Sequence, residues 1–190
     1  MDKYKIIALF GESGSGKDTI QNRMVSESSD VHKIISCTTR PKREYEKEGY
    51  DYFFLDTIEF SKKVLDGTML EATSFNDWFY GTPLESLDKE KINIGVFNIE
   101  GIKCLLEDSR LEIIPVYVQV KPKTRLVRTL LREDDPDCYE ICRRFITDTE
   151  DFSKIKTNDC FDYYIIDNNK PLEDDIVQIW VNMFKDIFNN

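Results

Sequence analysis

The sequence has little of two residue types on which many enzymes and exported proteins depend. It contains one histidine, His32, among 190 residues. Histidine is the usual base that activates a serine or cysteine nucleophile, so hydrolases of that kind are not expected. The five cysteines are odd in number and include no C-x-x-C pair, which argues against a disulfide framework and against a structural zinc site. We therefore expect a reducing, cytoplasmic environment.

Positive charge and long apolar runs are also scarce. The chain has 26 lysines and arginines against 36 aspartates and glutamates, a net charge of −10. Surfaces that coat nucleic acid are basic, so no nucleic-acid partner is predicted. No apolar run approaches the length that spans a membrane, and the first residues show no signal-peptide pattern, so no membrane partner is predicted either. A hydrophobic content of 41% and this length favour one folded domain.

The most informative stretch is residues 11–19, which read GESGSGKDT. It follows an apolar, β-branched run over 4–10 that is typical of a buried strand, and it precedes a helix predicted over 19–28. Strand, glycine-rich turn and helix form the context of a phosphate-binding loop. In such a loop, backbone N–H groups and a lysine, here Lys17, hold the phosphates of a nucleotide. We therefore predict that this loop binds ATP through Gly11, Glu12, Ser13, Gly14, Ser15, Gly16, Lys17, Asp18 and Thr19.

One position of the loop departs from the pattern GxxxxGK[ST]. Asp18 stands where a serine or threonine hydroxyl is expected to meet magnesium, and Thr19 supplies a hydroxyl one residue later. A carboxylate can bind Mg²⁺ directly or through water. The sequence thus predicts Mg²⁺ as cofactor, with Asp18 and Thr19 as its candidate ligands.

The rest of the chain alternates between patterns of strands and of helices. Strands are predicted over 33–37, 50–55, 68–75, 94–99, 112–120 and 163–167. Helices are predicted over 57–65, 101–109, 122–132, 139–152 and 171–188, the first of them capped by Asp56. A turn predicted at 80–83 leads into a further short helix. This alternation predicts an α/β fold with a parallel sheet, helices on both of its faces and a strand-rich insertion.

Two groups of basic residues are candidate anion sites in this acidic chain. The first follows a predicted strand and consists of Arg40, Lys42, Arg43 and Lys47. The alternative for this group is a solvated, charged loop. The second group is Arg125, Arg128 and Arg132, whose spacing of three and four residues predicts that they share one face of a helix.

Four stretches, in order, resemble the guanylate kinase family of nucleoside monophosphate kinases. They are the glycine-rich loop, the run SCTTRPKREYEKEGYDYFF, the pair LEATSF and FYGT, and FNIE followed by the arginine-bearing segment. The resemblance implies a three-layer P-loop kinase sandwich. Its core would be 1–35, 91–131 and 145–190, with a monophosphate-binding subdomain at 36–90 and a lid at 132–144. It also implies transfer of the γ-phosphoryl group of ATP to GMP or dGMP, in a monomer or homodimer.

The resemblance further implies roles for individual residues. The positions that match holders of the monophosphate's phosphate are Arg40, Arg43, Tyr52 and Tyr80. The positions that match readers of guanine are Ser36, Glu71 and Thr82, and a carboxylate at Glu71 can accept from both N1–H and the 2-amino group. The implied catalytic cations are Lys17, Arg40, Arg132 and Arg144.

Three residues depart from the family's pattern. Asn98 and Glu100 stand in place of an Asp-x-Asp pair and are assigned to the GMP site. Asp167 stands in place of an asparagine near adenine and is assigned to the ATP site. These departures leave room for a broader, viral-type deoxynucleoside monophosphate kinase. A second alternative is a non-catalytic guanylate-kinase-like interaction domain, although such domains tend to lose the glycine-rich loop that this chain retains.

Overall fold

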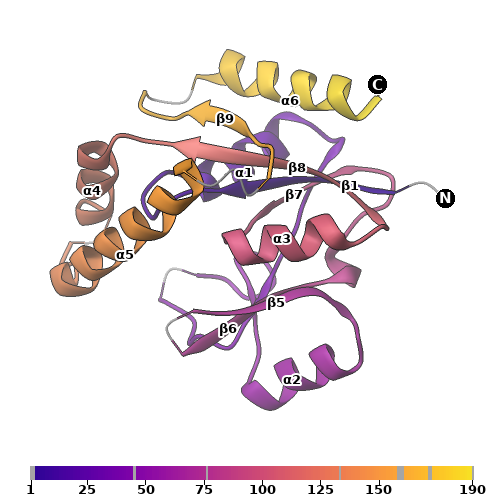
Figure 1. Ribbon diagram of the computed structural model, residues 1–190, viewed down its shortest axis with the longest axis horizontal. Coiled ribbons are helices and arrows are strands. Elements are labelled where there is room, and N and C mark those ends of the chain that lie inside the picture. Colours follow the sequence, from indigo (N-terminus) through magenta and orange to yellow (C-terminus); the bar gives the residue numbers. More distant parts are fainter. Residues whose placement is uncertain are drawn as a thin grey trace.

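A five-stranded parallel sheet forms the centre of the computed structural model, which describes residues 3–44, 46–75, 77–132, 134–157, 161–170 and 173–189 (Figure 1). The strand order is β2-β7-β1-β8-β9. The bounds are β1 Tyr4–Phe10, β2 Val31–Lys33, β7 Ile92–Val96, β8 Leu111–Gln119 and β9 Tyr164–Asp167. Strand β1 lies between β7 and β8 and pairs in parallel with both. The loop that follows β1 is thereby held at the middle of the sheet's carboxyl edge, where α/β proteins bind ligands.

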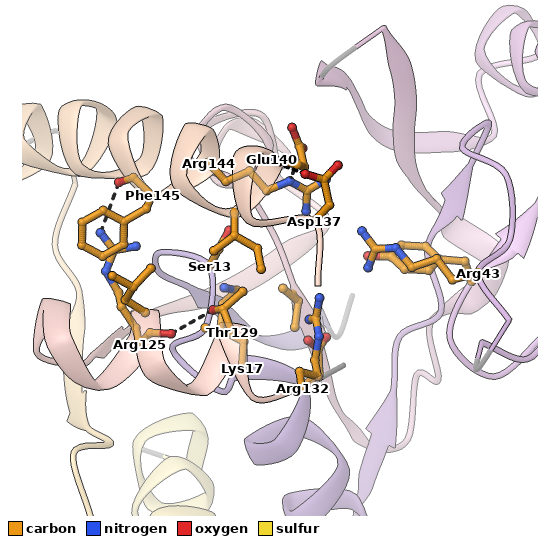
Figure 2. A pocket seen from close by; sticks show the side chains of 16 residues that line it. Ser13, Lys17, Arg43, Arg125, Thr129, Arg132, Asp137, Glu140, Arg144 and Phe145 are labelled. Carbon is orange, nitrogen blue, oxygen red and sulfur yellow. Dashed lines mark hydrogen bonds and ion pairs between the residues drawn. The ribbon is translucent and has the colours of Figure 1, made fainter. Parts of the chain in front are cut away.

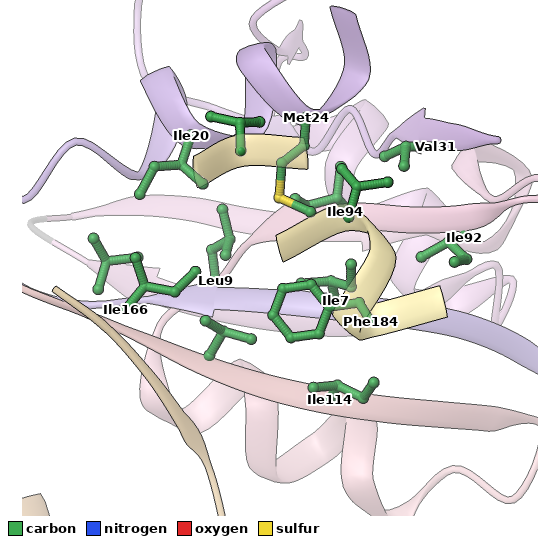
Figure 3. Close-up of a cluster of buried hydrophobic side chains, with 14 of the residues drawn as sticks. Ile7, Leu9, Ile20, Met24, Val31, Ile92, Ile94, Ile114, Ile166 and Phe184 are labelled. Carbon is green, nitrogen blue, oxygen red and sulfur yellow. The ribbon is translucent and has the colours of Figure 1, made fainter. Parts of the chain in front are cut away.

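Helices cover both faces of this sheet. Helices α1 (Lys17–Glu27) and α6 (Asp174–Asn189) cover one face, where Ile7 and Leu9 of β1 point into a core with Met24 and Phe184 (Figure 3). Helices α3 (Ile99–Glu107) and α5 (Cys138–Thr157) cover the other face, where the alternate β1 residues 6, 8 and 10 are buried. The strand is hydrophobic on both sides because both sides are covered. The predicted α/β class with a parallel sheet and two helical layers is confirmed.

A second, four-stranded sheet lies beside the core in the order β4-β3-β6-β5. Its strands are β3 Cys37–Thr38, β4 Phe53–Phe54, β5 Met69–Phe75 and β6 Trp78–Pro83, and α2 (Thr57–Leu65) packs against it. The bounds of α2 match the prediction, because Asp56 and Glu59 form a capping box that fixes the helix start locally. Helix α3 contacts β5 and joins this sheet to the core.

Two sequence predictions are wrong in this region. The single strand predicted over 33–37 is two strands in different sheets, because β2 ends at Lys33 and β3 begins at Cys37. The turn predicted at 80–83 is the last four residues of β6, and the short helix predicted after it is the 3-10 helix Leu84–Ser86. Gly81 serves packing and not turning: a Cβ there would come within 2.9 Å of the Glu71 carbonyl oxygen and 3.0 Å of the Phe60 ring.

Helices α4 (Pro122–Leu130) and α5 pack against each other at one end of the molecule (Figure 1). The predicted common face of three arginines is wrong. Arg125 is 2% exposed, whereas Arg132 lies beyond the end of α4 and is exposed. The predicted lid, 132–144, includes Glu133, which is outside the described residues, and the start of α5. No helix within the described ranges combines the length and hydropathy needed to cross a membrane.

Candidate active site

The glycine-rich loop leaves β1 at its carboxyl end and leads directly into α1. Gly14 has a φ of 78°, and a Cβ there would lie 2.4 Å from Thr129 Oγ1 of α4. Gly16 has a φ of 88°, and a Cβ there would lie 2.5 Å from Asn168 Nδ2. Both positions therefore need glycine for conformation and for space. The loop is pressed between α4 and the segment after β9.

Lys17 is held by the loop itself. Its ammonium group donates to the carbonyl oxygens of Gly11 at 2.8 Å and Glu12 at 3.1 Å. Burial lowers the pKa of Lys17, and the carboxylates of Asp18, Asp148 and Glu12 oppose that shift. Glu12 is itself buried and accepts a 2.8 Å hydrogen bond from the Tyr117 hydroxyl.

A cavity of about 410 Å³ opens on one side of Lys17. We refer to it as the arginine cavity, because Arg43, Arg132 and Arg144 line it from three separate segments (Figure 2). In Figure 2, Arg43 and Arg132 point toward the same space. The predicted residues that line this cavity are Ser13, Gly14, Lys17, Asp18, Arg43, Tyr52, Arg132 and Arg144. Converging cations beside a phosphate loop suit a polyphosphate.

Glu140 ties two arginines of α5 together. It accepts from Arg144 Nε at 2.6 Å and from Arg143 Nε at 2.7 Å. The hydrogen bond from Arg143, together with that from Arg144, lowers the pKa of Glu140 to about 2. These side chains are partly exposed, so the ion pairs hold orientation more than they add stability.

A second cavity, of about 460 Å³, lies on the other side of Lys17 and is the Glu71 cavity. The predicted residues that line it are Gly11, Ser13, Lys17, Ser36, Tyr52, Glu71, Tyr80, Asn98 and Glu100. Thr82 lies behind the lining and donates a 2.7 Å hydrogen bond to Glu71 Oε1, and its hydroxyl is 3.2 Å from that of Ser36. Burial raises the pKa of Glu71 to about 7, and the hydrogen bonds from Thr82 offset part of that rise.

Asn98 fixes the start of α3 at the edge of this cavity. Its side-chain oxygen accepts from the Gly101 N–H at 2.7 Å, and its amide donates to Thr73 Oγ1 at 2.9 Å. The residue thus caps a helix and contacts β5 at the same time.

Arg40 lines neither cavity. It is buried, and its Nη2 donates to Glu46 Oε1 at 2.6 Å. The other oxygen of Glu46 accepts from the backbone N–H of Arg43 at 2.8 Å. Burial alone would raise the pKa of Glu46, but these hydrogen bonds hold it below its usual range. Glu46 was not among the predicted site residues, although its place inside the basic cluster of 40–47 was a signal for it.

Five further predicted residues also line neither cavity: Glu12, Ser15, Gly16, Thr19 and Asp167. Thr19 is exposed on α1. Asp167 is exposed, and its carboxylate accepts from the Asn169 N–H at 3.0 Å. The next residue, Asn168, is buried and donates to the Ser15 carbonyl at 2.7 Å. No local pattern in the sequence marked Asn168.

The described residues contain no cluster of three or more metal-binding side chains. Asp18, Asp137 and Glu140 line the arginine cavity, and Asp18 is the one that directly follows Lys17 of the phosphate loop. Mg²⁺ is commonly held by one or two carboxylates together with substrate phosphates and water, so this donor set fits it.

Comparisons with known proteins agree on one family. Residues 3–185 match the family model described as "Guanylate kinase". The guanylate kinase of Zymomonas mobilis is 31% identical over 169 residues, which cover 86% of this chain and 76% of the relative. That of Campylobacter jejuni is 28% identical over 168 residues, which cover 86% of this chain and 80% of the relative.

Among solved structures, the chain is similar to a crystal structure of guanylate kinase from Anaplasma phagocytophilum. The TM-score is 0.66, and the match covers 97% of this chain and 86% of that chain. Because the two share 23% sequence identity, this likeness bears on the fold alone.

Proposed function

Because the chain belongs to the guanylate kinase family, we infer that it is a kinase that transfers the γ-phosphoryl group of ATP to GMP or dGMP. The products are ADP and GDP or dGDP. The protein needs no covalent intermediate in such a reaction, because positioning and charge neutralisation do most of the work. The roles of individual residues below are our proposal.

One observation carries the proposal: Lys17 and Ser13 line both cavities. In-line transfer requires the donor's terminal phosphate and the acceptor's phosphate to meet at one point. The arginine cavity is the candidate donor side and the Glu71 cavity the candidate acceptor side. The Lys17 ammonium would leave the loop carbonyls to stabilise the charge that develops at the junction.

On the acceptor side, we propose that Glu71 reads guanine. Its ionised carboxylate accepts from N1–H and the 2-amino group, while Thr82 and Ser36 hold it in place. Adenine offers no matching pair of donors and would leave the buried carboxylate unpaired, which costs about 1–3 kcal/mol. Asn98 and Glu100 are assigned to the same site because they line the cavity.

The acceptor's phosphate is assigned to the basic group beside that cavity. Arg43, Tyr52 and Tyr80 line the two cavities between them, and Arg40 lies behind Tyr52, with its guanidinium 5.7 Å from the ring. Glu46 positions Arg40 and the backbone of Arg43. Two guanidinium groups and two phenols suit a phosphate dianion.

On the donor side, we propose that the loop residues 11–19 hold ATP, that Asp167 lies near adenine, and that Arg132 and Arg144 neutralise the transferring group. The two arginines belong to the proposed lid, 132–144, which moves against the core (1–35, 91–131 and 145–190). The monophosphate-binding subdomain, 36–90, moves likewise. Closure of both parts would exclude water and limit wasteful hydrolysis of ATP.

Mg²⁺ is the proposed cofactor, and Asp18 is the residue that would hold it. The bound ion would supply charge neutralisation between the β- and γ-phosphates. Thr19, which lines neither cavity, would act only through a shift of the loop. A cytoplasmic location is proposed because the described cysteines are free thiols. The monomeric or homodimeric state and the lack of nucleic-acid or membrane partners stay predictions.

A coupled assay of ADP release tests the function. The acceptors are GMP, dGMP, AMP and dTMP at equal concentration with ATP and Mg²⁺. We expect turnover with GMP and dGMP that exceeds turnover with AMP and dTMP by at least about 100-fold, as a site built around polar pairing allows. Preference for dTMP or AMP would favour the broader deoxynucleotide kinase. No turnover with any acceptor would favour the interaction domain.

A further inference from the structure

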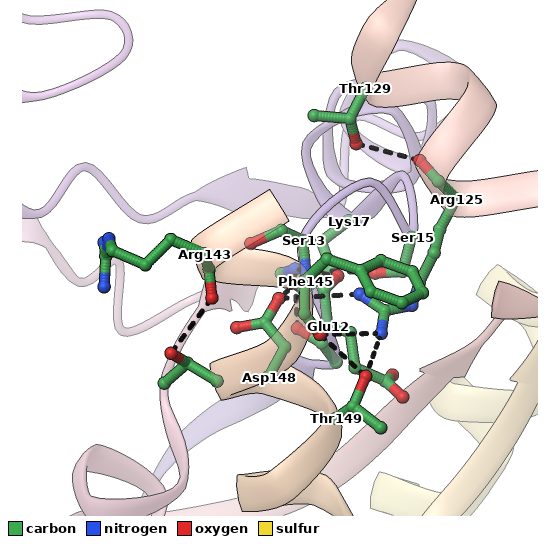
Figure 4. A network of polar contacts seen from close by, with 12 residues as sticks. Glu12, Ser13, Ser15, Lys17, Arg125, Thr129, Arg143, Phe145, Asp148 and Thr149 are labelled. Atoms are coloured by element: carbon green, nitrogen blue, oxygen red, sulfur yellow. Dashed lines mark hydrogen bonds and ion pairs between the residues drawn. The ribbon is translucent and has the colours of Figure 1, made fainter. Parts of the chain in front are cut away.

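Asp148 of α5 reaches the phosphate loop. Its Oδ2 atom accepts a 2.5 Å hydrogen bond from the backbone N–H of Ser13 (Figure 4). The exposed N–H groups of such a loop are the groups that cradle phosphate oxygens. An anionic oxygen of the protein itself therefore lies on a donor group of the phosphate site. It is also close enough to Lys17 to oppose the fall of that residue's pKa.

Arg125 of α4 is the cation on the other side of this carboxylate. It is 2% exposed, it lines the arginine cavity, and its guanidinium stacks 3.9 Å from the centre of the Phe145 ring. Its Nη2 donates to Thr149 Oγ1 at 2.8 Å. Its Nε and Nη1 are buried and have no hydrogen-bond partner among the residues that the structure describes.

The carboxylate does not satisfy this arginine. Asp148 Oδ2 lies 3.7 Å from Arg125 Nη1, which is an ion-pair distance and too long for a hydrogen bond. A buried N–H group without a partner is unfavourable, and an ionised one more so. A tetrahedral phosphate carries more oxygens and more charge than a carboxylate. It could therefore bond to Ser13 and fill the two open N–H positions of Arg125 together.

We propose that Ser13 N–H, Lys17 and Arg125 form a subsite for the terminal phosphate of the donor nucleotide, and that Asp148 is an internal anion which competes for it. This inference rests on the proposed function. Binding of ATP expels the carboxylate, and because Asp148 is part of α5, its release frees the helix that carries Arg144. Entry of the donor and movement of the arginines are then one event. Asp148 lowers the apparent affinity for ATP by the fraction of time in which it fills the subsite.

The test measures binding without turnover. Calorimetric titrations with Mg²⁺ and no acceptor compare ATP, AMP and inorganic tripolyphosphate on wild type and Asp148→Asn. We expect Asp148→Asn to bind ATP and tripolyphosphate about 10-fold more tightly, which corresponds to a competent state populated to roughly one tenth in wild type. Affinity for AMP, which has no terminal phosphate at this point, should not change.

The matched control is Glu150→Gln, which removes the same charge from an exposed position on α5 that lines neither cavity. It should leave all three affinities unchanged. A second measurement is informative even if Asp148→Asn is less stable than wild type. Tripolyphosphate should raise the midpoint of thermal unfolding more for Asp148→Asn than for wild type, because phosphate replaces the lost partner of Arg125.

Equal or weaker binding of ATP by Asp148→Asn would overturn the proposal and leave Asp148 a structural partner of Arg125. A gain for AMP equal to that for ATP would overturn it as well. The outcome is separable from the proposed function. If wild type phosphorylates GMP but Asp148→Asn binds ATP no more tightly, only the proposed competition by Asp148 is wrong. If Asp148→Asn binds ATP more tightly but no GMP is phosphorylated, only the assignment of GMP as the acceptor is wrong.

Discussion

In the Glu71 cavity the polar side chains bond to one another, whereas in the arginine cavity the cations come from three separate segments. Glu71, Thr82 and Ser36 form a chain of contacts across neighbouring strands. Arg144, by contrast, pairs with Glu140 four residues earlier on its own helix. The first arrangement is already formed by hydrogen bonds, whereas the proposed closure would have to bring the cations of the second together. Under the proposed function, base choice would rest on a rigid surface and transfer on a mobile one.

The most damaging change should strike the point shared by both cavities. Lys17→Ala removes a cation next to the reacting phosphates, and we expect kcat to fall by about 10³-fold or more, the scale of losing a preorganised charge. Lys123→Ala, at an exposed position of α4 that lines neither cavity, is the control. Circular dichroism should show both variants folded. Near-normal turnover of Lys17→Ala would contradict the phosphate-loop assignment.

The next largest effect is expected from Glu71→Gln, which disrupts the hydrogen-bonded Glu71 cavity. The amide sets a donor against a guanine N–H, so kcat/KM for GMP and dGMP should fall about 10- to 100-fold, or about 1–3 kcal/mol. Affinity for ATP should be unchanged. A calorimetric titration with ATP and a turnover matrix check both statements. Unchanged selectivity for guanine over adenine would count against Glu71 as the reader of the base.

The pKa of Glu71 gives the same cavity a pH dependence. Because burial raises it to about 7, the carboxyl is protonated below that pH, and kcat/KM for GMP should rise with pH up to about 7. The folded-state pKa exceeds the unfolded value, so this residue's contribution to stability is complete below about pH 4 and is lost as pH rises through 7. Glu71→Gln should therefore gain in urea stability over wild type between pH 5 and 8. A constant difference would refute this.

Glu46 fixes the residues proposed to hold the acceptor's phosphate in the same way. Glu46→Gln weakens the contacts that orient Arg40 and the Arg43 backbone, so KM should rise about 10-fold, a typical loss for a charge-assisted hydrogen bond. The factor should be the same for GMP and dGMP and should resemble that of Arg43→Ala. Glu44→Gln, at an exposed position in the same loop, should be silent. A base-dependent effect would place Glu46 elsewhere in the mechanism.

In the arginine cavity, Asp18 is the residue expected to hold the metal. Asp18→Ala should need several-fold more Mg²⁺ for half-maximal rate, because one carboxylate ligand is lost. Asp18→Ser should retain the wild-type requirement, since a hydroxyl replaces the carboxylate. A magnesium titration of the three proteins decides this. Identical curves would move the role to Thr19 or to water.

The smallest effect is expected at Glu140. Glu140→Gln releases Arg143 and Arg144 from partly exposed ion pairs, which are weak in water, so KM for ATP should fall by less than about 5-fold. Raising the salt concentration should erase the difference, because screening weakens both proteins' contacts. A rise in KM would instead indicate that Glu140 aims Arg144 at the donor.

The sequence predicted best those features that neighbouring residues determine. Helix α2 matched its predicted bounds because its capping box lies within four residues. The glycine loop and β1 matched because both signals are contiguous. The turn predicted at 80–83 was wrong because Gly81 is required by close packing against the Phe60 ring and the Glu71 backbone. Both residues are too far from Gly81 in the sequence for a local pattern to reveal the contact.

Among the site residues, the family resemblance named most of the polar side chains that line the two cavities, but it did not name Glu46 and Asn168, which hold the loops beside them. Glu46, Asn168 and Arg125 act through contacts that depend on the tertiary fold. The sequence placed Arg125 on one helix face with two other arginines, whereas the structure buries it with its guanidinium against the Phe145 ring of α5. Acidic and basic side chains that are buried by distant elements leave no periodic pattern in the sequence.

The position of β1 in the sheet also bears on how the protein is made. Strand β1 is synthesised before β8 and β9, which complete its side of the sheet, and before α6, which covers Ile7 and Leu9. Asn168 bonds to Ser15 from 153 residues away. Contacts this distant in sequence form late and slow folding. The phosphate loop therefore cannot be set until nearly the whole chain has emerged, and a nascent chain stalled before β9 should not be retained on immobilised ATP. Until then Ile7 and Leu9 lack the cover that α6 provides, and apolar surface exposed in this way makes a nascent chain prone to aggregation.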